Sequence, residues 1–244
     1  ITELQSAQRA AAWADVARRI AHEIKNPLTP IQLSAERLKR KYLTLITKEQ
    51  DLFISLTETI SRQVADIGRM VDEFSSFARI PAAKLASNDL KKIIESQITL
   101  HTGANSKIDF HLEISNGPLI VLCDDHQIRQ MITNLVQNSI DSITAREDNG
   151  NLDKGIVKIK SSIKSDFCLL KIIDNGIGLP TEISNRLTEP YVTTREKGTG
   201  LGLAIVAKIV EDHGGILKIQ DVSGQESGVV VTITIPLVET EYAK

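Results

Sequence analysis

Apolar residues recur three or four positions apart in the first third of the chain, a spacing that predicts two long amphipathic helices. A polar turn with the sequence TLITKEQ, residues 44–50, separates the two patterns, so we expect an antiparallel helical hairpin. The first helix, over 13–42, has an apolar stripe made of Ala17, Ile20, Ile24, Leu28, Ile31, Ala35, Leu38 and Tyr42. The second, over 53–74, has one made of Phe53, Leu56, Ile60, Val64, Ile67, Met70, Val71 and Phe74.

A hairpin of two helices with narrow stripes cannot cover both stripes by itself. The usual solution is pairing with a second copy as a four-helix bundle, so we expect a homodimer formed through residues 1–80. The next segment, RIPAAKLASNDL at 79–90, has a proline and small residues that end the helix and predict a short linker. These patterns divide the chain into a helical domain over 1–82 and a second domain over 83–244.

The second domain alternates between strand and helix patterns, which predicts an α/β sandwich with helices on one face of a mixed sheet. The fold class of the whole chain is therefore α+β. Helical spacing occupies 88–101, 125–145 and 202–213. Segments rich in β-branched residues predict strands over 107–114, 118–123, 155–164, 166–174, 215–220 and 228–235.

Composition narrows the function classes. The 244 residues suit two domains, and 41% apolar with 25% charged residues is typical of a globular protein. A formal net charge of −2 gives no indication of nucleic acid or of an acidic membrane surface as a partner. Cys123 and Cys168 follow neither disulfide nor zinc spacing, and no run of about 18 apolar residues predicts a membrane span. Because the chain begins at Ile1, already in a helical pattern, we expect a piece of a longer protein.

The segment RRIAHEIKNPLTPIQ, residues 18–32, carries the first candidate chemistry. His22 falls between two stripe positions, so its side chain should be exposed. Glu23 beside it can accept the imidazole proton and leave a nucleophilic ring nitrogen. Asn26, one turn further on, could orient a water or a phosphoryl oxygen. Pro27 and Pro30 remove backbone donors, so the helix should bend after the site; the continuing apolar stripe disfavours the alternative that the helix ends there.

A row of short polar side chains marks the helix over 125–145. Asn134, Asn138 and Asp141 follow one another at i, i+4 and i+7, away from the apolar side. An amide oxygen is a suitable weak ligand for Mg²⁺, which keeps several waters while it bridges phosphates. The row therefore indicates a metal–phosphate site with Asn138 as a ligand, although a solvated helix face is the simpler alternative.

Two glycine-rich segments follow. In DNGIGLP, residues 174–180, Asp174 ends a strand and could accept a hydrogen bond from an adenine amino group, while Gly176 and Gly178 allow close backbone approach. A hairpin turn is the alternative. In GTGLGLAIVAKIV, residues 198–210, glycines lead into a helix, where free N–H groups can hold phosphate. The polar stretch before it, 186–198, predicts a mobile lid or a simple surface loop.

The other histidines are interpreted as structural. His213 precedes two glycines, as at a helix C-terminus where glycine takes the left-handed conformation. The remaining ones are His101, His111 and His126.

Taken in order, HEIKNP, NLVQN, DNGIG and GTGLGL resemble the H, N, G1 and G2 boxes of the sensor histidine kinases of two-component systems. The resemblance implies a dimerisation and phosphotransfer hairpin followed by an ATP-binding domain of the Bergerat type. It implies His22 as phosphoacceptor, Glu23 as its base, Asn138 as Mg²⁺ ligand with Asn134 nearby, and Asp174 as adenine contact. The pocket and lid would then consist of Asp141, Gly176, Gly178, Thr193, Thr194, Gly198, Thr199, Gly200, Leu201 and Gly202.

Longer stretches resemble the NtrY-type nitrogen-regulation sensor kinases, among them RQVADIGRMVDEFSSFARIP and RLTEPYVTTREKGTGLGLAIV. That resemblance implies an NtrX-type response regulator as partner, upstream HAMP and PAS segments, and a full-length protein anchored in the bacterial inner membrane with this part in the cytoplasm. The sequence departs from the broader kinase pattern in its lid, where Leu187 and Tyr191 replace phenylalanines common in relatives. Phosphatase activity toward the regulator is a further expectation, motivated by Asn26.

Two other function classes remain open. An ATP-hydrolysing conformational machine, as in the gyrase, Hsp90 and MutL relatives, would carry a glutamate where this chain has Asn134, which cannot act as a base. A degenerate adaptor that docks a regulator without binding ATP is disfavoured because all four boxes are present.

Overall fold

The computed structural model describes residues 2–78, 81–104, 107–115, 117–148, 150, 154–180, 182–194, 198–222 and 227–237. The chain divides into two compact units. The first consists of Ile1–Pro81 together with Arg195–Leu201, and the second of Ala82–Thr194 and Gly202–Lys244. Among the helices of the described residues, none combines the length and the apolar character that crossing a bilayer requires.

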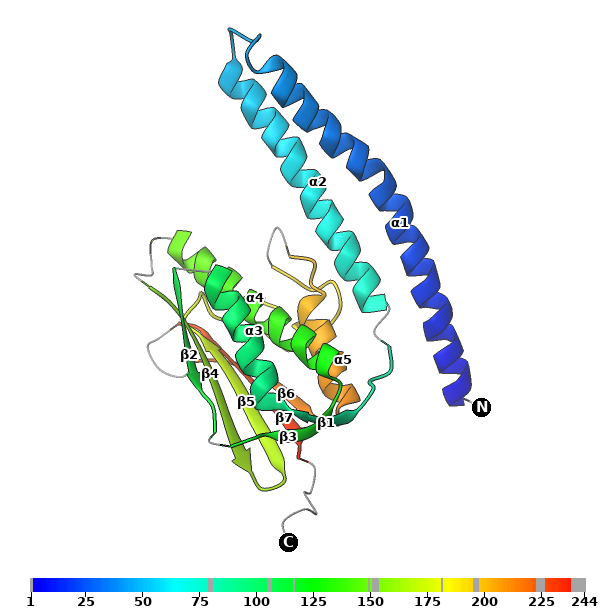
Figure 1. Ribbon diagram of the computed structural model, residues 1–244, viewed down its shortest axis with the longest axis vertical. Helices are drawn as coiled ribbons and strands as arrows, with labels where there is room; N and C mark the ends of the chain where they lie inside the picture. Colours follow the sequence, from blue (N-terminus) through cyan, green and yellow to red (C-terminus); the bar gives the residue numbers. More distant parts are fainter. Residues whose placement is uncertain are drawn as a thin grey trace. The chain divides into compact units, whose positions relative to one another are not determined.

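The first unit is the expected antiparallel hairpin, formed by α1 (Thr2–Tyr42) and α2 (Gln50–Ala78) (Figure 1). Pro27 and Pro30 lie inside α1, which continues through both as one helix. The alternative that the helix ends at the prolines is therefore wrong. An ion pair with a Nζ–Oε1 distance of 2.6 Å joins Lys39 of α1 to Glu58 of α2. The hydrogen bond and charge of Lys39 lower the pKa of the Glu58 carboxyl.

Only the small members of the apolar stripes are well buried in the single chain. Ala17, Ala21 and Ala35 of α1 are buried, as are Val64 and Val71 of α2. Eight of the larger apolar side chains in the stripes keep 38% to 55% of their surface exposed, so a single hairpin leaves its stripes partly uncovered, as expected. These exposed side chains are Ile20, Ile24, Ile31 and Leu38 on α1 and Leu56, Ile60, Ile67 and Met70 on α2.

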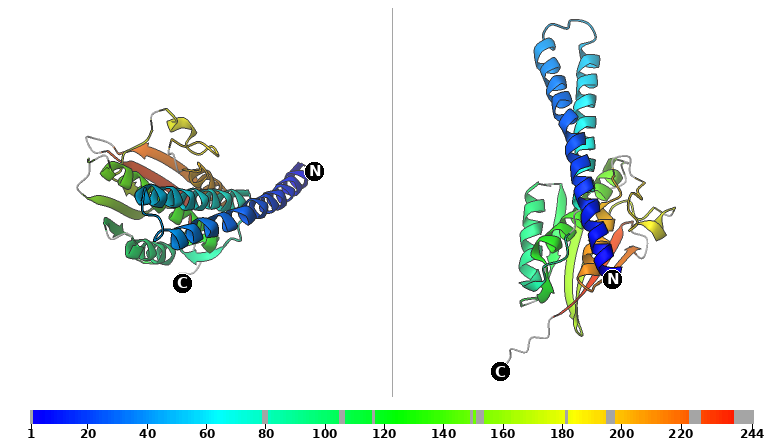
Figure 2. Two further views of the ribbon diagram at one scale, coloured as in Figure 1. Left: turned by 90° about the horizontal axis from the view of Figure 1, so that it is seen from above. Right: turned by 90° about the vertical axis from the view of Figure 1, so that its right-hand side faces the viewer.

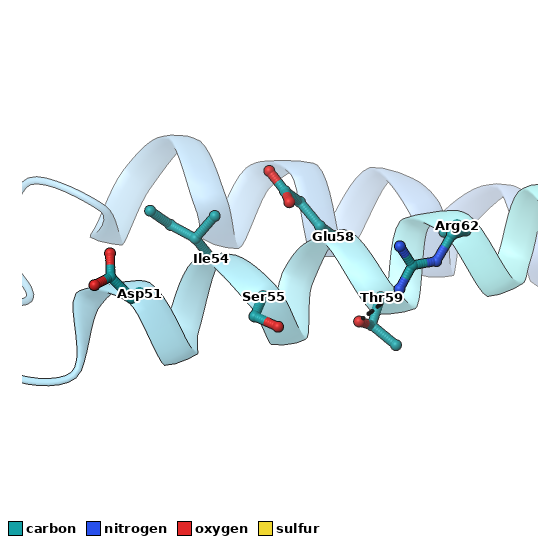
Figure 3. A pocket seen from close by; sticks show the side chains of 6 residues that line it. All are labelled: Asp51, Ile54, Ser55, Glu58, Thr59 and Arg62. Carbon is teal, nitrogen blue, oxygen red and sulfur yellow. Dashed lines mark hydrogen bonds between the residues drawn. The ribbon is translucent and has the colours of Figure 1, made fainter. Parts of the chain in front are cut away.

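A shallow hollow lies on α2 close to the hairpin turn (Figure 3). It is lined by one face of a single helix, and two of its charged groups are engaged locally: Glu58 pairs with Lys39, and Arg62 Nη2 donates to Thr59 Oγ1 at 3.1 Å. The hollow therefore has no enclosed wall and no convergent free charge that would mark it as a ligand site.

The second unit is a five-stranded mixed sheet with the order β2-β4-β5-β7-β6. β2 and β4 pair in parallel and the other neighbours are antiparallel. Three helices pack on one face of this sheet, as predicted (Figures 1 and 2). The strands are β2 (Ile108–Glu113), β4 (Gly155–Lys164), β5 (Phe167–Asp174), β6 (Ile216–Asp221) and β7 (Val229–Pro236). The helices are α3 (Leu90–Ala104), α4 (Asp125–Asp148) and α5 (Gly202–Asp212).

The linker prediction is wrong at its C-terminal end. Residues 86–89 form β1 (Ala86–Asp89), which pairs antiparallel with β3 (Ile120–Cys123) in a separate two-stranded sheet. The helix expected from residue 88 therefore begins at Leu90. Asp89 sets this boundary, because its Oδ1 accepts the N–H groups of Lys91 at 3.2 Å and Leu119 at 3.1 Å.

A polar junction connects the start of this unit to the ends of two helices. The Asp124 carboxylate accepts the N–H of Gln127 at 3.1 Å, which caps α4, and the N–H of Lys84 at 2.9 Å. Burial raises the pKa of the Asp124 carboxyl, but the hydrogen bonds from the backbone N–H groups of Lys84, Gln127 and His126, together with His213, lower it, and the net shift is downward. The Asp124 N–H in turn donates to His213 Nε2 at 2.9 Å.

His213 has the structural role that was predicted for it. It directly follows α5, and Gly214 after it adopts a φ of 64°, the left-handed conformation expected at a helix C-terminus. The His213 ring is buried, and its Nδ1 lies 2.7 Å from the Ile209 carbonyl. Because Nε2 accepts a hydrogen bond, the proton resides on Nδ1.

Candidate functional site

The phosphoacceptor candidate lies on the accessible side of α1. His22, Glu23 and Asn26 are all exposed, whereas the neighbouring Ala21 is buried. Since successive helix residues are about 100° apart, burial of Ala21 turns His22 away from the hairpin interior. The expectation of an exposed His22, read from the phase of the apolar stripe, is confirmed.

Helix α4 connects the separate motifs of the second unit. Its apolar side is buried, while Asn134 and Asn138 are half-buried and Asp141 is exposed. A Cβ built on Gly202, the first residue of α5, would lie 3.8 Å from Asn138 Nδ2 and 3.9 Å from its Oδ1. The amide of Asn138 thus faces the start of α5, as a phosphate site between these helices requires. Asp141 accepts a hydrogen bond from Gln137 Nε2 at 2.7 Å.

The carboxylate of Asp174 is buried at the end of β5 and accepts hydrogen bonds from backbone N–H groups and from a side-chain hydroxyl. Its Oδ1 accepts the N–H of Gly176 at 2.9 Å and the N–H of Val229 at 3.3 Å. Its Oδ2 accepts the hydroxyl of Ser139, on α4, at 3.2 Å. These bonds fix the plane of the carboxylate. Each carboxylate oxygen can accept more than one hydrogen bond, so the group could also accept one from a nucleobase amino group.

The loop after Asp174 packs directly against α4. A Cβ at Gly176 would lie 2.2 Å from Ser142 Oγ, so only glycine fits there. Ser142 Oγ also accepts the N–H of Ile177 at 3.2 Å. Gly178 has a φ of 86°, a conformation that favours glycine. Steric limits therefore explain why glycine occupies both positions of this motif.

The predicted lid, 186–198, and the second glycine motif, 198–202, are the last two parts of the candidate nucleotide site. The short helix η1 (Ser184–Arg186) ends at the first residue of the predicted lid, and Thr193 and Thr194 within the lid are exposed; residues 195–197 lie outside the described part. Residues 198–201 belong to the first unit, where the Thr199 hydroxyl donates to the Glu73 carboxylate. Gly198 and Gly200 are half-buried, Leu201 is buried, and Gly200 has a φ of 70°.

Three residues of the nucleotide-site region were missed by sequence reasoning. Ser139 and Ser142 contact the Asp174 loop, and Arg146 Nη1 donates to the Asn175 carbonyl at 2.6 Å. Ser142 lies four residues after Asn138 and could have been found by extending that row along the helix, whereas Ser139 lies next to Asn138, about 100° round the helix, and is outside the row. Arg146 carried no signal, since an arginine near a helix end is common.

An ATP–Mg²⁺ complex fits the residues present. Among the described residues the Asn134 Nδ2 group is a buried donor without a hydrogen-bond partner, which a phosphate oxygen would satisfy. No cluster of three or more His, Cys, Asp or Glu side chains able to hold a metal occurs in the described part. A metal here would therefore take the Asn138 amide oxygen together with phosphate and water oxygens, which suits Mg²⁺.

Two family profiles match the chain. Residues 12–83 match the His Kinase A (phospho-acceptor) domain, and residues 123–239 match the histidine kinase-, DNA gyrase B-, and HSP90-like ATPase. Nitrogen regulation protein NtrY of Azorhizobium caulinodans is 51% identical over 221 residues, which is 91% of this chain and 28% of that protein. The chain belongs to the NtrY-type sensor histidine kinases. The chain covers only 28% of the length of this relative.

Solved histidine kinases share the fold of this kinase core. The structure of histidine kinase ThkA in complex with response regulator protein TrrA is 26% identical, has a TM-score of 0.64, and is matched over 97% of this chain and 65% of that chain. The catalytic domain of ThkA is 31% identical with a TM-score of 0.54, over 63% of this chain and 96% of that domain. The predicted helical region followed by an α/β ATPase domain is therefore confirmed for this kinase.

Proposed function

We propose that this kinase core transfers the γ-phosphoryl group of ATP to His22 and then to an aspartate of a receiver protein. The observation that supports this most is the presence in one chain of an exposed histidine beside a carboxylate and, in the region that matches the ATPase family, of a buried carboxylate, Asp174, fixed by hydrogen bonds. Neither feature alone would distinguish a kinase from an ATPase or an adaptor.

The transfer to His22 makes one bond and breaks one. A ring nitrogen of His22 forms a bond to the γ-phosphorus, the bond from that phosphorus to the β–γ bridging oxygen breaks, and ADP leaves with the electron pair. Glu23 accepts the imidazole proton. Bound Mg²⁺ would neutralise phosphate charge, with Asn138 as its protein ligand.

Incubating the chain with γ-labelled ATP and Mg²⁺, with and without an NtrX-type receiver, tests the proposal: label should appear on the chain and move to the receiver.

The identity of the residue at 134 separates this function from ATP hydrolysis. A hydrolytic member of the wider ATPase family needs a base to activate water, and an amide has no such capacity. The Nδ2 group of Asn134 is instead a free donor among the described residues, suited to bind a phosphate oxygen. ATP would thus be kept for transfer to His22.

The kinase should act as a homodimer, and the exposed apolar side chains of the hairpin support this. Replacing Ile60 and Ile67 together by Glu should convert a dimer to a monomer, because the charges would be buried in the pairing face. Light scattering measures the change in mass. Ile216→Glu, at an exposed apolar position on β6, is the matched control and should leave the mass at twice the monomer value. A wild-type chain that is monomeric at micromolar concentration would contradict the proposal.

We also propose phosphatase activity toward the phosphorylated receiver. The exposed Asn26 amide lies one turn beyond His22 and could position the attacking water. Asn26→Ala should slow receiver dephosphorylation by about tenfold or more, as loss of a water-positioning group does, while nucleotide affinity stays unchanged. The lifetime of phosphorylated receiver is the measurement, with Thr29→Ala, one turn away on the same exposed region, as control. Equal lifetimes with Asn26 and with Ala would remove this activity from the proposal.

The similarity to nitrogen regulation protein NtrY supports a role in nitrogen regulation, and an NtrX-type regulator as receiver is the expectation from the sequence resemblance. Because this chain matches only 28% of that relative, sensing and membrane anchoring would be supplied by parts of the full-length protein outside this chain.

A further inference from the structure

The loop that presents Asp174 is backed by a second stretch of main chain, Ser227 and Gly228. A Cβ at Gly228 would lie 2.0 Å from the Asp174 carbonyl oxygen, so the two backbones touch. Ser227 Oγ donates to the Gly176 carbonyl at 2.9 Å. The orientation of the Asp174 carboxylate therefore depends on how these two stretches of backbone are held together.

Three carbonyl oxygens from the two stretches converge on one group, the guanidinium of Arg146. Its Nη1 lies 2.6 Å from the Asn175 oxygen, 3.4 Å from the Gly176 oxygen and 3.3 Å from the Ser227 oxygen. Carbonyl oxygens carry partial negative charge and repel one another when they converge. A cation between them removes that repulsion and supplies charge-assisted hydrogen bonds.

Arg146 reaches this position from the last turn of α4. The same helix carries Ser139, which bonds the Asp174 carboxylate, and Ser142, which bonds the loop at Ile177. The loop that presents Asp174 is thus attached to α4 through three side chains, those of Ser139, Ser142 and Arg146. Of these three, Arg146 also binds the 227–228 segment, through the Ser227 carbonyl.

We propose that Arg146 is a positioning residue for nucleotide recognition: it joins the 175–176 and 227–228 backbones so that the Asp174 carboxylate faces the adenine. This inference rests on the proposed ATP binding. Because the contact is on the base side of the pocket, it acts on every adenine nucleotide alike and does not act on the transfer step.

The test compares three variants for binding of fluorescent ATP and ADP analogues. Arg146→Met, which removes the charge and keeps the length, should weaken both nucleotides by the same factor of about ten. Arg146→Lys should retain most of the affinity, because an ammonium carries three donors for three carbonyls. Arg129→Met is the matched control, since Arg129 lies on the same helix but pairs with Asp125 at 2.8 Å; it should bind as wild type does.

Autophosphorylation provides a readout that a merely structural role would not give. For the Met variant the KM for ATP should rise while kcat stays near the wild-type value. Wild-type affinity in the Met variant, or an equal loss in the Met and Lys variants, would overturn the proposal. If the Met variant does not fold, Ser227→Ala decides, because it removes one bond between the same segments and should weaken both nucleotides about threefold; unchanged binding would overturn the idea. A wild-type chain that binds no nucleotide would instead refute the proposed function.

Discussion

Replacing His22 with glutamine should abolish acid-labile, base-stable label on the chain after incubation with γ-labelled ATP and Mg²⁺. Glutamine has a good helix propensity and no nucleophilic nitrogen, and the position is exposed, so stability should change by less than about 0.5 kcal/mol. Nucleotide affinity should be unchanged, because His22 is not among the residues assigned to the nucleotide site.

The control for this experiment is His111→Gln, at an exposed histidine on β2, which should incorporate label as wild type does. Label that persists without His22 would contradict the phosphoacceptor assignment. Steady ATP hydrolysis that is fast and independent of His22 would favour the conformational ATPase over the kinase.

Replacing Asp174 with asparagine should lower ATP affinity by about tenfold to a hundredfold, the range expected when a charged hydrogen-bond partner is lost in a buried site. The asparagine oxygen can still accept the N–H groups of Gly176 and Val229, so the loop should keep its conformation. Its amide nitrogen then occupies the place of Oδ2, next to Ser139. An N–H donor at that place would face the N–H groups of the adenine amino group, and two donors cannot form a hydrogen bond with each other.

The same substitution should change base preference. Inosine triphosphate has an oxygen where ATP has the amino group, so the ratio of ATP to inosine triphosphate affinity should fall in the asparagine variant. Titration calorimetry of both nucleotides measures this. Asp109→Asn, at a half-buried carboxylate paired with Lys154 at 2.6 Å, should leave both affinities unchanged. An unaltered ratio in the Asp174 variant would mean that this carboxylate does not contact the base.

The parts of the fold that could be predicted from the sequence are those set by local periodicity. The strand predicted over 155–164 is found as β4 (Gly155–Lys164), and exposure of His22 follows from its phase in α1. β1 was missed because its sequence, ASND, has no strand character by itself. It becomes a strand because β3 offers a pairing edge more than 30 residues later, a long-range cause that no local pattern contains.

The same distinction applies to the nucleotide site. Asp174 and its glycines form a local motif and could be found, whereas Ser139 and Arg146 act across gaps of 35 and 29 residues respectively. Such contacts depend on how α4 crosses the end of β5, which is a result of packing. The predicted roles of Gly198, Thr199, Gly200 and Leu201 stay predictions, since these residues belong to the helical unit here.

The pairing of β1 with β3 sets the shortest piece of the chain that can fold as an ATPase unit. The family match begins at residue 123, yet a fragment cut there would lose α3 and its contacts with α4, among them the hydrogen bond from the Thr133 hydroxyl to Gln97 Oε1 at 3.1 Å. It would also lose β2, and with it the parallel partner of β4. Because Asp124 binds the N–H of Lys84, expression of this unit alone should start upstream of that residue, well before the recognisable family sequence.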